Sequence, residues 1–345
     1  MIIVMEHNAT QEQVKRVIQY IEDRGMNSYV HKGDLLNVVA VIGDEINLNA
    51  ENIAALEGVS TVKKIQEPYK LVSRVAHPED TIVKFPNGVK IGGLEKPVLM
   101  VGPCSVEKDF DGLLQVAMAA KEMGCQFLRG GAFKPRTSPY DFQGLEEKGL
   151  QYLAQAREKT GLLVVTEVMD TMDIALLSQY ADVLQVGARN MQNFKLLKAL
   201  GRIKKPVMIK RGPAATIKEF LLAAEYVVSN GNPNVILCER GVKGFDSQFS
   251  RNVLDIAAVP IIRKYSHLPV IVDPSHGTGK RYLIEPMGKA ALVAGSHGLM
   301  FEVHHDPDNA MCDGAQSLNI EQFKEVAKSF NKLIGRIDYD NKNSK

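Results

Sequence analysis

Eight short apolar segments between residues 98 and 303 constrain the fold of this chain more than any other feature of its sequence. They occupy residues 98–101, 126–129, 162–167, 183–186, 207–210, 235–239, 270–272 and 299–303. Stretches with helical periodicity alternate with them, for example residues 109–123 and 217–228. The alternation predicts an α/β fold, a (β/α)₈ barrel, with a doubly wound open sheet as the alternative.

The first 73 residues follow a different pattern, βαββαβ, which predicts a small ferredoxin-like domain. Thr10 and Gln13 have the spacing of a capping box at the start of its first helix, and residues 32–34 form a tight turn between two strands. Asn87-Gly88 between two alternating runs predicts a β-hairpin that plugs the barrel bottom or packs the linker. The predicted division is a ferredoxin-like domain (1–73), a linker with the hairpin (74–96), the barrel (97–338) and a tail (339–345).

The composition limits the classes of function. A chain of 345 residues that is 45% hydrophobic can build a large core. Its formal net charge of +2 gives no global field that would draw it to nucleic acid or to an anionic membrane. The apolar run at residues 1–5 is too short for the core of a signal peptide, and no later stretch is long and uncharged enough to span a membrane. The four cysteines are widely spaced. We therefore expect a cytoplasmic protein with reduced thiols, without nucleic-acid or membrane partners.

Basic side chains gather where several of the predicted strands end, which is the catalytic face of a barrel. They are Arg129, Lys134, Arg136, Arg189, Lys210 and Arg240. Their mutual repulsion favours a ligand with several negative charges. Alternatively, some of them form structural ion pairs with Glu167, Glu239 or Asp273. Since neighbouring strand residues point in opposite directions, only one of Lys210 and Arg211 can face the pocket.

Cys104, His276 and Glu302 lie at the ends of strands one, seven and eight, which become neighbours when the barrel closes, and Asp313 lies in the loop after strand eight. A thiolate, an imidazole and two carboxylates suit divalent transition metals. The spacing alone leaves this metal site open, because a single cysteine is often a buried apolar group and a single histidine is often only hydrogen-bonded. His304, two residues after Glu302, is a rival ligand.

Longer motifs around these residues resemble a known family. They are Gly102-Pro103-Cys104-Ser105-Val106-Glu107, residues 128–139 with Lys134-Pro135-Arg136-Thr137 at their centre, Gly187-Ala188-Arg189-Asn190, Ile236-Leu237-Cys238-Glu239-Arg240-Gly241 and Asp273-Pro274-Ser275-His276. The chain resembles the type I 3-deoxy-D-arabino-heptulosonate-7-phosphate (DAHP) synthases, in particular the beta subgroup with an N-terminal ferredoxin-like regulatory domain. The resemblance covers nearly the whole chain.

The resemblance implies a metal-dependent condensation of phosphoenolpyruvate with erythrose 4-phosphate, the first step of the shikimate pathway to aromatic amino acids. It implies that Cys104, His276, Glu302 and Asp313 bind a divalent metal of the Mn, Co, Fe or Zn class. The substrate contacts that it implies are Arg189, Lys210 and Arg240 for the phosphate of phosphoenolpyruvate, Arg129 and Lys134 for its carboxylate, and Arg136 and Thr137 for the phosphate of erythrose 4-phosphate. It also implies a homotetramer inhibited by tyrosine or phenylalanine at the N-terminal domain.

Lys134 is the predicted proton donor to the forming alkoxide, and it joins Cys104 and His276 as a predicted catalytic residue. We expect the positive charges of Arg129 and Arg136 to lower its pKa. Glu167, Glu239 and Asp273 are candidates for orienting the ligands or the attacking water.

Two other functions stay open. A 3-deoxy-D-manno-octulosonate-8-phosphate synthase uses arabinose 5-phosphate, but its aldose segment typically reads Lys-Ala-Asn-Arg where this chain has Lys134-Pro135-Arg136-Thr137. A metabolite-sensing barrel without catalysis is the second alternative. Tyr29, His31 and Lys32 mark a possible effector pocket or a solvated turn, and Cys104 with Cys312 is a candidate disulfide pair.

Overall fold

The larger of two compact units contains the barrel. The computed structural model describes residues 1–32, 37–42, 48–63, 68–136, 138, 140–246 and 248–337. One unit consists of Met1–Asp80 with Lys264–His267, and the other of Thr81–Arg263 with Leu268–Lys345. The predicted tail, 339–345, lies outside the described residues.

A four-stranded antiparallel sheet forms the smaller unit. Its elements are β1 (Ile2–Met5), α1 (Gln11–Glu22), β2 (Asn27–Lys32), β3 (Asn37–Ile42), α2 (Ala50–Ala54) and β4 (Val59–Lys63), and the strand order is β2-β3-β1-β4. The capping box of Thr10 and Gln13 starts α1 as predicted. One face of α1, with Val14, Val17 and Ile21, packs on the sheet. The element order confirms the βαββαβ pattern, and the predicted turn after residue 32 lies outside the described residues.

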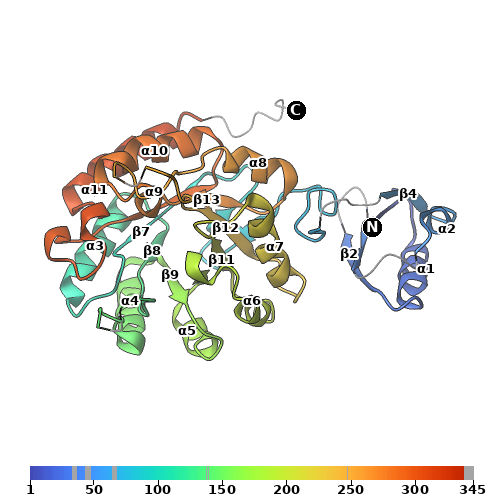
Figure 1. Cartoon of the computed structure of the whole chain (residues 1–345), viewed down its shortest axis with the longest axis horizontal. Helices are drawn as coiled ribbons and strands as arrows, with labels where there is room; N and C mark the ends of the chain where they lie inside the picture. Colours follow the sequence, from blue (N-terminus) through green and yellow to red (C-terminus); the bar gives the residue numbers. More distant parts are fainter. Residues whose placement is uncertain are drawn as a thin grey trace. The chain divides into compact units, whose positions relative to one another are not determined.

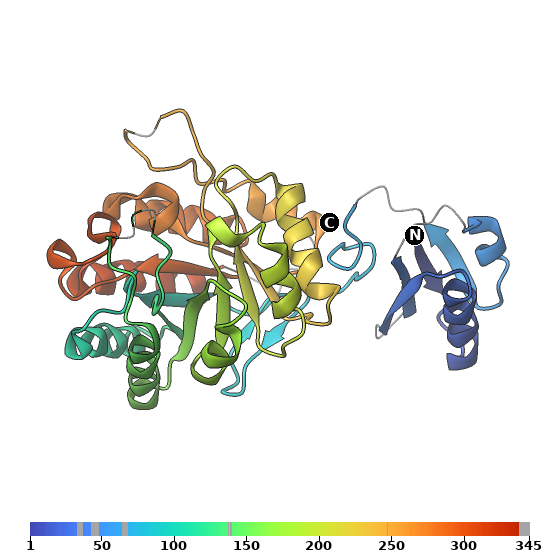
Figure 2. The ribbon, with the colours of Figure 1, turned by 60° about the horizontal axis from the view of Figure 1, so that its bottom comes forward.

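Eight parallel strands close into a barrel in the larger unit (Figures 1 and 2). They are β7 (Val98–Gly102), β8 (Phe127–Arg129), β9 (Leu163–Val168), β10 (Val183–Val186), β11 (Val207–Lys210), β12 (Val235–Glu239), β13 (Val270–Val272) and β14 (Gly298–Glu302). The last strand pairs in parallel with the first, from Gly298 opposite Val98 to Glu302 opposite Gly102. This pairing confirms the barrel and excludes the open doubly wound sheet, which would leave both edge strands unpaired.

Helices surround the strands on the outside (Figure 1). They are α3 (Phe110–Glu122), α4 (Glu146–Thr160), α5 (Ile174–Tyr180), α6 (Phe194–Leu200), α7 (Ile217–Val228), α8 (Ala258–Tyr265), α10 (Arg281–Val293) and α11 (Ile320–Ile334), with the short α9 (Pro274–Thr278) directly after β13. Side-chain caps begin several of them, since Asp109 caps α3 and Thr216 forms a capping box with Glu219 at α7.

The predicted hairpin plugs one end of the barrel. Its strands β5 (Val83–Lys84) and β6 (Lys90–Ile91) flank the Asn-Gly turn, where Gly88 has a φ of 88°. The side chains of Val83, Phe85 and Ile91 belong to the same buried cluster as the first residues of several barrel strands. The rings of Phe85 and Phe127 meet edge to face at 5.1 Å between centroids. The hairpin therefore closes the N-terminal end of the barrel, and the opposite end stays available for a site.

Candidate active site

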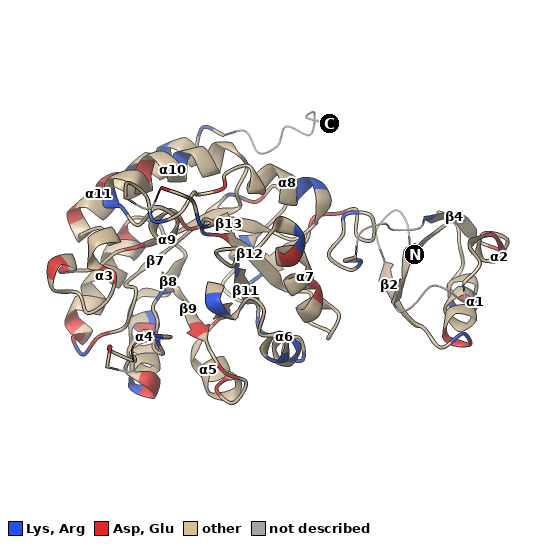
Figure 3. Ribbon diagram, viewed as in Figure 1, with Lys and Arg blue, Asp and Glu red and all other residues tan. Residues whose placement is uncertain are grey.

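A cavity of about 440 Å³ opens at the carboxyl ends of the barrel strands. Seven basic side chains line it, namely Arg129, Lys134, Arg136, Arg189, Lys210, Arg240 and Arg251. Figure 3 shows Lys and Arg in blue, and strands β8 and β11 each end in such a residue. Glu167, Asp141 and Asp313 are the acidic residues of the lining. The excess of positive charge makes the cavity a site for anions.

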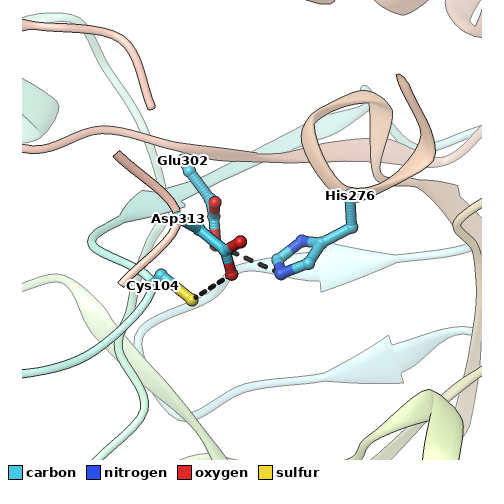
Figure 4. Close-up of side chains that lie close together, drawn as sticks. All are labelled: Cys104, His276, Glu302 and Asp313. Carbon is cyan, nitrogen blue, oxygen red and sulfur yellow. Dashed lines mark hydrogen bonds and ion pairs between the residues drawn. The ribbon is translucent and has the colours of Figure 1, made fainter. Parts of the chain in front are cut away.

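The four predicted metal ligands lie together beside this cavity. One ligand atom from each of Cys104, His276, Glu302 and Asp313 lies within 4.8 Å of the other three. Figure 4 shows their side chains turned toward a common centre, with Cys104 Sγ 3.1 Å from Asp313 Oδ2 and His276 Nε2 3.2 Å from Glu302 Oε1. Cys104 and Glu302 are buried, and the other two are partly buried.

Asp273 orients the imidazole of His276. Its Oδ2 accepts a hydrogen bond from His276 Nδ1 at 2.7 Å, and its Oδ1 accepts one from the His276 backbone N–H at 2.9 Å. Since the carboxylate can only accept, Nδ1 carries the proton and Nε2 faces the other ligands. Burial opposes ionisation of Asp273, but His276 and Lys210 hold its pKa well below the usual value. A carboxylate behind a histidine is the usual support of a metal-binding imidazole.

The two carboxylate ligands are held by different partners. Arg129 Nη1 donates to Glu302 Oε1 at 3.0 Å, and the amide of Gln316 donates to Glu302 Oε2. Arg251 Nη2 donates to Asp313 Oδ1 at 3.1 Å. Asp313 has a φ of 53°, a left-handed conformation that few non-glycine residues adopt. These contacts fix both side chains before any ligand binds.

The donor set fits a divalent transition metal. The hydrogen bond with Cys312, together with burial and the nearby Glu302, raises the pKa of Cys104 well above its usual value. A thiol and two carboxylates in one buried cluster repel one another when ionised, and a divalent cation among them would remove that repulsion. Thiolate, imidazole and carboxylate together match the ligand types of such metals.

The basic residues divide into paired and unpaired groups. Arg211 binds the carboxylates of Glu239 and Asp255, both at 2.8 Å, and does not line the cavity, whereas its neighbour Lys210 lines it and pairs with Asp273. The prediction that one member of this pair is structural is therefore confirmed. Among the residues that the structure describes, neither Arg189 nor Arg240 has a carboxylate within ion-pair distance.

Arg136 lies between two partners at the cavity wall. Its guanidinium contacts Asp141 Oδ2 at 3.2 Å and Cys312 Sγ at 2.9 Å. Thr137, which is predicted together with Arg136 to bind the phosphate of erythrose 4-phosphate, lies outside the described residues.

The expected direction of the Lys134 pKa is wrong. Burial and the charge of Arg129 act to lower this pKa, but the negative charges of Cys104 and Cys312 in their thiolate forms outweigh them and the net shift is upward. Lys134 Nζ lies 3.1 Å from Cys104 Sγ. Lys134 therefore remains protonated at neutral pH.

His304 is not part of the metal cluster. Its Nε2 lies 3.4 Å from Glu107 Oε1, and its ring stacks on His305 at 4.5 Å between centroids. Sequence reasoning missed the contributions of Arg251 and Gln316. Arg251 lies far from any apolar segment, in the long connection between β12 and α8, so no strand-end rule pointed to it.

Comparison with known proteins identifies the family of the chain. The model of the DAHP synthetase I family matches residues 80–337. The chain belongs to this family. A second model, that of the DAHP synthase ferredoxin-like domain, matches residues 1–67 of this DAHP synthetase family member.

Curated relatives of this family member cover most of its length. It is 47% identical over 333 residues to the phospho-2-dehydro-3-deoxyheptonate aldolase of Thermotoga maritima, and the matched region covers 96% of this chain and 97% of the relative. It is 32% identical over 258 residues to the 2-dehydro-3-deoxyphosphooctonate aldolase of Syntrophotalea carbinolica, which covers 70% of this chain and 91% of the relative. The octonate enzyme is the more distant of the two.

Solved structures of related proteins have the same fold. The crystal structure of the Thermotoga maritima phospho-2-dehydro-3-deoxyheptonate aldolase (DAHP synthase) matches with a TM-score of 0.76 at 46% identity and covers 97% of each chain. A truncated form of the 3-deoxy-D-arabino-heptulosonate 7-phosphate synthase from the same organism matches with a TM-score of 0.70 and covers 77% of this chain and 96% of that chain. Within the part of the chain that the structure describes, no helix is long and apolar enough to cross a membrane.

Proposed function

We propose that this chain condenses phosphoenolpyruvate with erythrose 4-phosphate and water to give DAHP and phosphate, the first step of the shikimate pathway. The observation that carries the proposal is the pairing of a four-ligand cluster with a cavity lined by seven cations. Both substrates carry phosphate, and phosphoenolpyruvate adds a carboxylate. Guanidinium groups bind both kinds of anion with paired hydrogen bonds.

Cys104, His276, Glu302 and Asp313 would hold a divalent metal of the Mn, Co, Fe or Zn class. When bound there, the metal supplies Lewis-acid polarisation of the aldehyde. Asp273, Arg129, Gln316 and Arg251 keep the four ligands in place through the contacts described above. This ligand set does not select one metal of the class sharply, so the metal that the cell supplies would decide which one binds.

The cations would divide between the two substrates. We assign Arg189, Lys210 and Arg240 to the phosphate of phosphoenolpyruvate, because the two arginines lack a carboxylate partner among the described residues and Lys210 lines the same cavity. Arg129 and Lys134 lie beside the metal ligands and would hold the carboxylate. Arg136 and Thr137 would hold the phosphate of erythrose 4-phosphate.

Lys134 would donate the proton that the forming alkoxide needs. C3 of the enol attacks the aldehyde carbon, water adds at C2, and cleavage of a carbon–oxygen bond then releases phosphate. Lys134 Nζ carries its proton at neutral pH and lies next to Cys104, at the metal end of the cavity. Protonation of the oxygen as the bond forms would avoid a free alkoxide.

Lys134→Met tests this role, with Lys121→Met on the outer surface of α3 as its control. We expect turnover by Lys134→Met to fall by about 10²–10⁴-fold, the range of general acid catalysis, and the control to be unaffected. Turnover within about tenfold of the native rate would exclude the proton-donor role.

The choice of aldose separates this function from its nearest rival. Purified protein with phosphoenolpyruvate and a divalent metal should release phosphate with erythrose 4-phosphate and not with arabinose 5-phosphate. The reverse preference would assign the chain to the octulosonate-8-phosphate synthases. No phosphate release with either aldose, at any metal tested, would favour the sensing barrel without catalysis.

The ferredoxin-like domain would regulate this activity. We propose that an aromatic amino acid, tyrosine or phenylalanine, binds it as an inhibitor and that the protein assembles as a homotetramer in the cytoplasm. Removal of residues 1–73 should leave catalysis and abolish inhibition, measured as phosphate release with and without each amino acid. Inhibition that survives the deletion would place the effector on the barrel. Analytical ultracentrifugation would test the tetramer.

A further inference from the structure

A second cluster of metal-binding side chains lies in the smaller unit. His31 is on β2, and His77 and Glu79 follow the last strand of the ferredoxin-like sheet in the chain. One ligand atom from each lies within 4.8 Å of the other two. We propose that His31, His77 and Glu79 form a second site for a divalent transition metal, distinct from the cluster in the barrel and independent of the proposed catalysis.

His77 is prepared to act as a ligand. Its Nδ1 lies 2.6 Å from the backbone carbonyl oxygen of Glu79. Because a carbonyl can only accept a hydrogen bond, Nδ1 must carry the proton, and in the neutral ring Nε2 then keeps its lone pair. A histidine that binds metal usually donates its other nitrogen to a carbonyl or carboxylate in this way. Burial, with the nearby His31, lowers the pKa of His77, which favours the neutral ring.

The His77 ring is also fixed in its plane. It stacks on His267, with ring centroids 4.1 Å apart and an angle of 18° between planes. His267 is buried, and its Nε2 lies 2.8 Å from the backbone oxygen of Leu71. A ring held on one face by stacking and at one nitrogen by a hydrogen bond loses little conformational freedom when a metal binds.

The other two ligands already form a hydrogen bond with each other. His31 Nε2 lies 3.0 Å from Glu79 Oε2, and the rings of His31 and His77 approach to 3.7 Å between centroids. In tetrahedral zinc, with metal–ligand bonds of about 2.0–2.2 Å, ligand atoms are separated by about 3.3–3.6 Å. A cation can thus replace the proton of the hydrogen bond between His31 and Glu79 with small side-chain movements. The side chains of His31 and Glu79 are 18% and 46% exposed, so an ion can enter from solvent.

Two imidazoles and one carboxylate define the class of metal. This set suits zinc and the neighbouring borderline metals cobalt, nickel and copper, with solvent in the remaining position. It contains no thiolate, unlike the barrel cluster with Cys104. Occupancy would tie β2 to residues 77–79 and so stabilise the smaller unit by mass action.

Cobalt titration of the metal-free full-length chain tests the proposal, because only cobalt at the barrel cluster produces a thiolate charge-transfer absorption. We expect two bound cobalt ions per native chain, measured by equilibrium dialysis. The variants His31→Gln and His77→Gln should each bind one, with the charge-transfer absorption unchanged. His7→Gln, at an exposed histidine of the same unit, is the matched control and should bind two. A single ion per native chain, or two ions in the His77→Gln variant, would overturn the proposal.

Chemical labelling of the native chain avoids dependence on the folding of a variant. Zinc added to the full-length protein should protect His31 and His77 from carbethoxylation by diethyl pyrocarbonate, read by peptide mass spectrometry. His7 should be modified equally with and without zinc. Unchanged modification of His31 and His77 in saturating zinc would refute the site.

Discussion

Asp273→Asn should weaken metal binding in the barrel without touching any metal ligand. The carboxylate accepts hydrogen bonds from His276 Nδ1 at 2.7 Å and from the His276 backbone at 2.9 Å, and it pairs with Lys210 Nζ. An asparagine can keep the backbone bond with its oxygen. Its NH₂ group would then face two donors, the imidazole N–H and the lysine ammonium.

The imidazole can relieve that clash only by moving or by shifting its proton to Nε2, and Nε2 is the atom that faces Glu302. We therefore expect metal affinity to fall by about 10–100-fold, the usual effect of losing such a support, which corresponds to about 1.4–2.7 kcal/mol. Lys210 would also lose the partner of a fully buried charge, and breaking such a pair costs about 3–5 kcal/mol of unfolding free energy.

Competition with a calibrated chelator measures the affinity, and denaturant unfolding of the metal-free protein measures the stability. Asp182→Asn is the control, because Asp182 pairs with Arg157 and accepts a bond from Val164 N at the opposite end of the barrel. It should lower stability and leave metal affinity unchanged. A loss of metal affinity below about threefold in Asp273→Asn would refute the tautomer argument.

Three further predictions rest on single residues. Arg240→Gln should raise the KM for phosphoenolpyruvate by about 10–100-fold, as expected for a charged hydrogen bond of about 1.5–3 kcal/mol, and leave the KM for erythrose 4-phosphate nearly unchanged in steady-state assays. The Sγ atoms of Cys104 and Cys312 lie 3.3 Å apart, so peroxide should oxidise the two thiols to a disulfide, with release of water and loss of the bound metal. The Cys312→Ser variant should keep its activity after the same peroxide treatment. Burial lowers the pKa of His267 to about 3, so between about pH 6.5 and 3 the imidazole is protonated in the unfolded chain and neutral in the folded one. The free energy of unfolding should therefore fall as the pH is lowered through that window, and His267→Gln should flatten the decline in thermal melts recorded across it.

Local sequence determined the elements of this fold. Apolar runs located all eight strands to within about a residue at each end, as for the run at 207–210 and β11. Capping boxes at Thr10 and Thr216 begin helices, and Asn87-Gly88 turns the hairpin. These signals are local because each depends on hydrogen bonds or steric limits within a few residues. The family motifs added the ligand set and the substrates.

Tertiary structure decided what lies beside what. Pairing of β14 with β7 closes the barrel and brings Asp313 within 3.1 Å of Cys104, more than 200 positions earlier in the chain. It also placed Lys210 rather than Arg211 at the cavity and Arg251 beside Asp313, and it raised the pKa of Lys134 through the charge of two nearby thiolates. Electrostatic energies vary with the distance between charges and with burial, and neither quantity is encoded by spacing along the chain. The sequence therefore named the chemical groups, and the closed barrel fixed their distances, partners and protonation.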